Sequence, residues 1–153
     1  MKKIQLSLLI IMMLFVFYCT TYAQLINIQR FIGRSQIELI NELGSPVHFD
    51  DSNPSMMYMA YNFLSIACIA DQNGIYKVEL TRKYTSEKEA FDDINDFISC
   101  SIKDGLITDS VSAKKYIISN SSIHTEITLE QINDSPYLEL KINASKKSEE
   151  KKG

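Results

Sequence analysis

The stretch Arg34–Pro46, R-S-Q-I-E-L-I-N-E-L-G-S-P, predicts a short helix with a defined beginning and end. Ser35 and Glu38 have the spacing of a capping box, in which each side chain bonds the backbone N–H of the other residue. Gly44 can adopt the left-handed conformation that ends helices, and Pro46 cannot continue one. The apolar residues fall on one side at helical spacing and are expected to be buried: Ile37, Leu39, Ile40 and Leu43.

A second helix is predicted to begin at Ser86, where the same serine-to-glutamate spacing recurs with Glu89. Gly105 supplies its end. Its apolar residues form one arc at helical spacing: Ala90, Phe91, Ile94, Phe97 and Ile98. Both predicted helices are followed by sequence typical of strands.

Alternating apolar and polar residues predict six strands, and the pair Asn73-Gly74 predicts a hairpin turn between two of them. The strands are expected at residues 57–64, 66–70, 76–81, 115–119, 123–132 and 137–142. Two segments rich in polar and turn-forming residues are expected to be loops, at 47–55 and 106–114.

Together these patterns predict an α+β fold of two helix-plus-antiparallel-sheet units, in the order α-βββ-α-βββ, with the helices packed on sheet. The units would be pseudo-repeats at about 28–83 and 84–145 within a single α+β domain, 24–145. Little aligns between the two halves beyond the capping motifs. True duplication and convergence on good capping therefore both stay open.

Residues 1–23 have the layout of a secretory signal peptide. Lys2 and Lys3 precede an apolar run at 8–18, and Thr21-Tyr22-Ala23 offers small residues for cleavage after Ala23. A retained membrane anchor is the less favoured alternative, because the run is too short to span a bilayer comfortably. We therefore expect a periplasmic or secreted protein.

The three cysteines have different expected roles. Cys19 would be a lipid attachment site only if a small residue preceded it, and Tyr18 stands there, so we expect Cys19 to be removed with the signal peptide. Cys68 and Cys100 would then reach a compartment where disulfides persist. The two residues form a candidate disulfide, and the alternative is that both are small buried hydrophobic side chains.

Charge argues against a nucleic-acid partner. Without Lys2 and Lys3 the chain has 14 basic residues against 19 acidic ones, a net charge of −5. The basic residues are scattered, whereas nucleic-acid-binding proteins gather them on one surface. The last segment, residues 146–153, mixes both signs without an apolar residue and is expected to be a disordered charged tail.

No set of residues in the sequence points to catalysis, a cofactor or a metal. His48 is followed by Asp50 and Asp51, but no second His or Cys lies nearby, which favours a solvated turn over a metal site. His124 and Glu126 share the polar side of a predicted strand. This favours a solvent-exposed face of the sheet over a role for His124 as a general base. Phosphate loops, nucleophile elbows and zinc motifs are missing. We therefore predict no catalytic, cofactor-binding or metal-binding residues.

Residues 28–80 resemble the SmpA/OmlA (BamE-like) family of outer-membrane assembly modules, in which a helix begins at Gly-Ser/Thr and ends in L-G-x-P before strands. The matching features are Gly33, Ser35, Leu43-Gly44-Ser45-Pro46, the tyrosine-bearing strand 58–61, and Asn73-Gly74 before Val78. The resemblance implies a role in the cell envelope. This chain departs from the family in having no usable lipobox and in continuing beyond a single module. Two units in tandem resemble, at the level of fold, the β-lactamase inhibitor proteins, which block an enzyme through a concave sheet.

The function expected from these features is that of an exported, non-catalytic protein that binds another envelope or secreted protein, as an assembly accessory or an inhibitor. One alternative is a small-molecule-binding protein or a hydrolase that uses carboxylates such as Asp50, Asp51, Glu126 or Glu130. That alternative requires at least two of these groups to converge in a concave site. Another alternative is a structural envelope component, which would self-associate.

Overall fold

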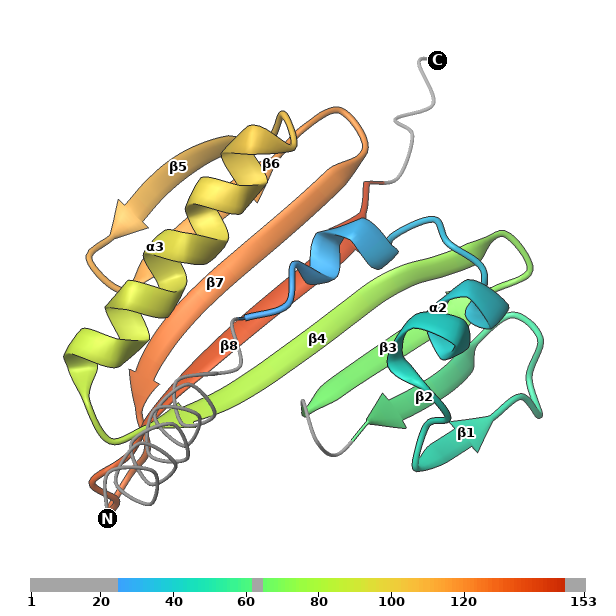
Figure 1. Ribbon diagram of the computed structural model, residues 1–153, viewed down its shortest axis with the longest axis horizontal. Coiled ribbons are helices and arrows are strands. Elements are labelled where there is room, and N and C mark those ends of the chain that lie inside the picture. Colours follow the sequence, from blue (N-terminus) through green and yellow to red (C-terminus); the bar gives the residue numbers. More distant parts are fainter. Residues whose placement is uncertain (1–24, 62–64, 148–153) are drawn as a thin grey trace, which may run out of the picture.

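The fold is one antiparallel sheet with helical segments on one of its faces (Figure 1). The computed structural model describes residues 25–61 and 65–147. The helical segments are η1 (Ile28–Phe31, a 3-10 turn), α2 (Gln36–Leu43) and α3 (Glu87–Lys103). The eight strands in these residues are β1 (His48–Asp50), β2 (Met57–Tyr61), β3 (Ile66–Asp71), β4 (Gly74–Tyr84), β5 (Ile107–Ser112), β6 (Lys115–Ser119), β7 (Ile123–Gln131) and β8 (Leu138–Lys146).

The prediction of two separate helix-plus-sheet units, α-βββ-α-βββ, was wrong. The strand order is β1-β2-β3-β4-β8-β7-β6-β5, so the last strands of two meanders pair with each other in the middle of a single sheet. Their register runs from Lys77 opposite Ser145 to Tyr84 opposite Leu138. This pairing satisfies two strand edges that separate units would expose, and it makes the eight strands continuous.

Both predicted helices are confirmed, together with their capping residues. In α2 the Ser35 hydroxyl accepts from the Glu38 backbone N–H, and the Glu38 carboxylate accepts from the Ser35 backbone N–H at 2.8 Å. In α3 the Ser86 hydroxyl accepts from the backbone N–H of Glu89. The predicted burial of α2 holds only in part, because Leu39 is fully buried whereas Ile37 is 70% exposed.

The predicted loops at 47–55 and 106–114 contain strands β1 and β5, so those two predictions were wrong. Both strands lie at the free edges of the sheet, and every residue of β1 is exposed. An edge strand with little burial has no alternation of apolar and polar residues for a sequence pattern to reveal.

The predicted turn between β3 and β4 is present, and Gly74 has a second role there. Gly74 has a φ of +109°, and the backbone of the lead-in to α2 lies against it. The Ile75 N–H donates to the Arg34 carbonyl at 2.8 Å, and the Gly33 N–H donates to the Ile75 carbonyl at 2.7 Å. These two bonds fasten the N-terminal segment to the beginning of β4.

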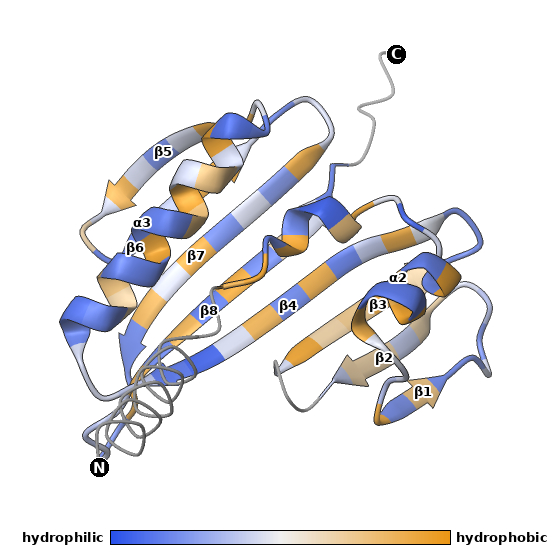
Figure 2. Ribbon diagram, in the orientation of Figure 1, coloured by the Kyte–Doolittle hydropathy of each residue, from blue (hydrophilic) through white to orange (hydrophobic). Residues whose placement is uncertain are grey.

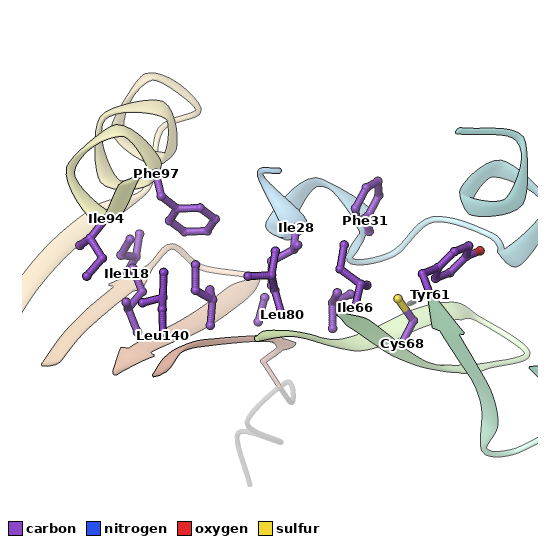
Figure 3. Packing of buried hydrophobic residues seen from close by; sticks show 14 of the residues in the cluster. Ile28, Phe31, Tyr61, Ile66, Cys68, Leu80, Ile94, Phe97, Ile118 and Leu140 are labelled. Carbon is purple, nitrogen blue, oxygen red and sulfur yellow. The ribbon is translucent and has the colours of Figure 1, made fainter. Parts of the chain in front are cut away.

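One hydrophobic cluster fills the space between the sheet and the helical segments. Ile28 and Phe31 of η1 lie in the middle of this cluster, between the residues of α3 and those of β2 and β3 (Figure 3). Along β7 and β8 apolar residues alternate with polar ones (Figure 2), and the polar ones form the uncovered face of the sheet. No helix among the described residues is long and apolar enough to cross a membrane.

β8 ends at Lys146, so the first residue of the predicted tail belongs to the sheet. The backbone N–H of Lys147 donates to the Ser122 carbonyl at 2.8 Å, and the Lys147 Nζ donates to the Asn120 carbonyl at 2.7 Å. The remainder of the tail, and the predicted signal peptide with Cys19, lie outside the described residues.

Candidate functional site

The structure does not bring the candidate carboxylates together. Asp50 and Asp51 are exposed at the β1 edge, whereas Glu126 and Glu130 belong to β7, and four strands of the sheet lie between β1 and β7. On the uncovered face Glu126 pairs with Lys115 at 2.5 Å. These four groups do not form the concave site that a carboxylate-based hydrolase would need.

The surroundings of Asp50 suit a structural role. Its Oδ1 accepts the Ser52 backbone N–H at 3.0 Å, and hydrogen bonds from the side chain and backbone of Ser52 lower the pKa of the Asp50 carboxyl. A lowered pKa disfavours the protonated form that a general acid needs.

The neighbouring His48 ring lies 5.8 Å from the ring of Tyr58, centroid to centroid. Within the described residues no group of three or more metal-binding side chains occurs.

The two cysteines of the candidate disulfide are free thiols at different places in the fold. Cys68 is fully buried in β3, and Cys100 is half-buried in α3. In Figure 3, Cys68 lies beside Tyr61 at one end of the core, and Phe97 of α3 lies toward the other, with Ile28 and Phe31 between them. In this arrangement η1 separates β3 from α3, whereas a disulfide requires Cα atoms within about 7 Å.

Exposed apolar side chains lie along the β1 edge of the sheet, on both of its faces. Of the nine large hydrophobic side chains that are exposed in the described residues, five lie between residues 37 and 58. We call them the β1-edge group: Ile37 of α2, Val47 and Phe49 at β1, and Met56 and Tyr58 at β2. An apolar group beside an unpaired strand edge is typical of a protein-binding surface.

A crevice of about 570 Å³ lies between η1, the C-terminal end of α3 and the turn that joins β6 to β7. We call it the η1–α3 crevice. Its size is in the range of small-molecule sites. Its lining combines amide, charged and apolar side chains: Asn27, Gln29, Arg30, Cys100, Lys103, Asp104, Leu106, Asn120 and Ile123.

Two amide side chains in this crevice are held through their nitrogen atoms. Gln29, only 2% exposed, donates from Nε2 to the Thr125 hydroxyl at 2.9 Å. Asn27 donates from Nδ2 to Asp104 Oδ2 at 2.7 Å. The oxygen of each amide is buried and has no hydrogen-bond partner among the described residues. A buried acceptor without a partner costs about 1–3 kcal/mol, so these oxygens are sites where a donor would bind favourably.

Charged groups surround the same crevice. Arg30, Lys103 and Asp104 are exposed at its rim. Arg30 forms an ion pair with Glu42. Lys103 has no carboxylate within ion-pair distance among the described residues. The crevice can therefore present a cation and several acceptors to one small molecule.

Sequence reasoning missed this crevice because its parts are far apart along the chain. Thr125 is 96 residues from Gln29, and Asp104 is 77 residues from Asn27. Neither amide belongs to a motif. The one available signal was two amide residues in the lead-in, Leu25 to Ile32, whose other residues are apolar except for Arg30.

No family model matches the chain, and no curated protein matches it. A solved structure to which it is similar is that of an extracellular protein containing an SCP domain from Bacillus anthracis strain Ames, with a TM-score of 0.44 and 8% sequence identity. The match covers 82% of this chain and 47% of the other, so the chain spans about half the length of that protein. A likeness at this level carries no argument about function.

Proposed function

We propose that the chain is an exported, non-catalytic protein that binds another envelope or secreted protein through the β1 edge of its sheet. The observation that carries this proposal is the β1-edge group. Val47 is 60% exposed, Met56 57% and Phe49 43%, although such side chains are stabilised by removal from water. A partner surface that covers them would gain this burial.

Charge indicates what kind of partner surface would fit. Between Ser35 and Tyr76 the sequence has no Lys or Arg, and five acidic residues occur there: Glu38, Glu42, Asp50, Asp51 and Asp71. Asp50 and Asp51 stand next to Phe49, at the end of β1. A partner that offers apolar side chains with Lys or Arg beside them would complement this edge in both hydrophobicity and charge.

The site of action follows from the N-terminal sequence. The basic start, the apolar run at 8–18 and the small residues before Gln24 support export by a signal peptide that is cleaved after Ala23. The partner would accordingly be an envelope or secreted protein, met in the periplasm or outside the cell.

Site-specific photo-crosslinking in cells tests the proposal. A photoreactive phenylalanine analogue at Phe49 should give a discrete crosslinked product with another protein. The same analogue at Tyr137 should give none, although Tyr137 is an aromatic residue with the same 43% exposure. Equal crosslinking at both positions, or none at Phe49, would refute the proposal. A product formed only between two copies of the chain would favour a structural, self-associating component instead.

A further inference from the structure

The η1–α3 crevice presents an unusual set of hydrogen-bonding groups. The amide nitrogen of Asn27 donates to the Asp104 carboxylate, which fixes the orientation of that amide, and the amide nitrogen of Gln29 donates to the Thr125 hydroxyl. Their oxygens remain without partners among the described residues. With the Asp104 carboxylate, the lining of the crevice therefore contains three groups that can accept hydrogen bonds.

We infer that the η1–α3 crevice is a binding site for a small zwitterion of the α-amino acid class. This inference is independent of the proposed protein-binding function, because it concerns other residues than the β1 edge. A primary ammonium group has three N–H donors, which match the amide oxygens of Asn27 and Gln29 and the Asp104 carboxylate. The ligand carboxylate would pair with Lys103, the rim cation that lacks a carboxylate partner among the described residues.

The apolar part of the lining suits the remainder of such a ligand. Leu106 and Ile123 line the crevice beside the charged groups and can contact an aliphatic side chain. The amide oxygens of Asn27 and Gln29 are buried. A ligand would reach them only with movement of the lining, and the side chains of Arg30 and Lys103 at the rim are exposed and long.

Nuclear magnetic resonance of the side-chain amide groups tests the inference on protein purified from cells that express the full chain. The probe is L-norvaline, and butylamine and pentanoic acid are matched analogues that lack its carboxylate or its amino group. We expect L-norvaline to shift the amide signals of Asn27 and Gln29 in a saturable manner. Each analogue should bind about tenfold more weakly, because it loses one charged contact.

Variants of exposed lysines separate a specific site from a general effect of charge. Lys103→Met should weaken L-norvaline binding about tenfold and leave butylamine binding unchanged, because butylamine has no carboxylate. Lys83→Met removes an exposed lysine outside the crevice and should change neither. The inference is overturned if neither amide shows a saturable shift, if all three compounds bind equally, or if both variants behave alike. The first of these results would indicate that water alone satisfies the amides.

Discussion

Cys68 and Cys100 differ in reactivity because their surroundings differ. Burial raises the pKa of the Cys68 thiol to about 12, and the thiolate is the form that reacts with alkylating agents. Cys100 is half-buried and lines the η1–α3 crevice. We expect iodoacetamide to label Cys100 in the native protein and to label Cys68 only after unfolding, as measured by peptide mass spectrometry.

The control for this prediction is Cys100→Ser, which should remove native labelling. A protein in which neither cysteine reacts until a reductant is added, even in denaturant, would show that Cys68 and Cys100 pair in solution. That result would require β3 and α3 to approach each other more closely than the present fold allows.

Gly74 should be the least replaceable of the described glycines. A Cβ atom at this position would lie 2.6 Å from the Arg34 carbonyl oxygen, and φ is +109°. We expect Gly74→Ala to lower the free energy of unfolding by about 3 kcal/mol, from backbone strain and from loss of the Ile75–Arg34 bond. Chemical denaturation measures this change.

Gly105→Ala is the matched control, because Gly105 also has a positive φ, +83°, but has open space around its Cβ position. It should cost only the strain of the left-handed conformation, about 1–2 kcal/mol. Equal losses in the two variants would mean that the contact between Gly74 and Arg34 is unimportant for stability.

Among the elements, α2 depends most on its cap. It has eight residues and buries only Leu39 fully, and helices this short are marginal without tertiary support. We expect Ser35→Ala to destabilise the protein by about 1 kcal/mol and to accelerate hydrogen exchange in α2 selectively. Ser99→Ala, at an exposed position within α3, should be neutral, since alanine favours helix.

The same cap gives α2 a predictable pH dependence. Hydrogen bonds from the Ser35 backbone and hydroxyl hold the pKa of Glu38 below its usual value. Because the pKa of Glu38 is lower in the folded state than in the unfolded state, its ionised carboxylate stabilises the folded protein. This stabilisation is complete at a pH above the unfolded-state pKa, and it is lost as the pH falls through the folded-state pKa. Ser35→Ala removes the hydroxyl bond but keeps the backbone N–H bond, so it should reduce this part of the acid dependence, which pH titration of hydrogen exchange in α2 would detect. An unchanged profile would contradict the assignment.

The elements also differ in how well the sequence predicts them. The helices were predictable because serine caps, terminal glycines and periodicity agree within each segment. The inner strands were predictable because one of their faces is buried. β1 and β5 lack that signal, since they lie at the sheet edges and all but one of their residues are exposed. In the β1-edge group, the burial of Ile37 was wrongly predicted for a related reason, because helical spacing does not tell how far a covering layer extends.

At the scale of the whole molecule, the sequence left two arrangements undetermined. The pairing of β4 with β8 joins segments more than 50 residues apart, and any long strand with a buried face could have taken either place. The η1–α3 crevice likewise depends on contacts between the first and last thirds of the chain. Local patterns describe neither arrangement, because both arise only when the two meanders share one sheet.

The shared sheet predicts that the molecule unfolds as one unit. Ile142 of β8 is fully buried and lies opposite both Leu80 of β4 and Ile127 of β7. Ile142→Ala should lower the free energy of unfolding by about 3 kcal/mol. Unfolding should still occur in a single transition. Hydrogen exchange should show the same loss of protection in β3 and β6, on opposite sides of the substitution.

Ile117→Ala provides the comparison, because Ile117 lies on the uncovered face of β6 and is only half-buried. The substitution should lower the free energy of unfolding by about 1 kcal/mol, because a half-buried side chain buries less apolar surface than a fully buried one. Two independent units would respond to Ile142→Ala in another way. β5 to β8 would lose protection while β3 kept it, and two transitions would appear on denaturation. Because β4 and β8 are paired over eight registered positions, disruption at their junction must propagate in both directions.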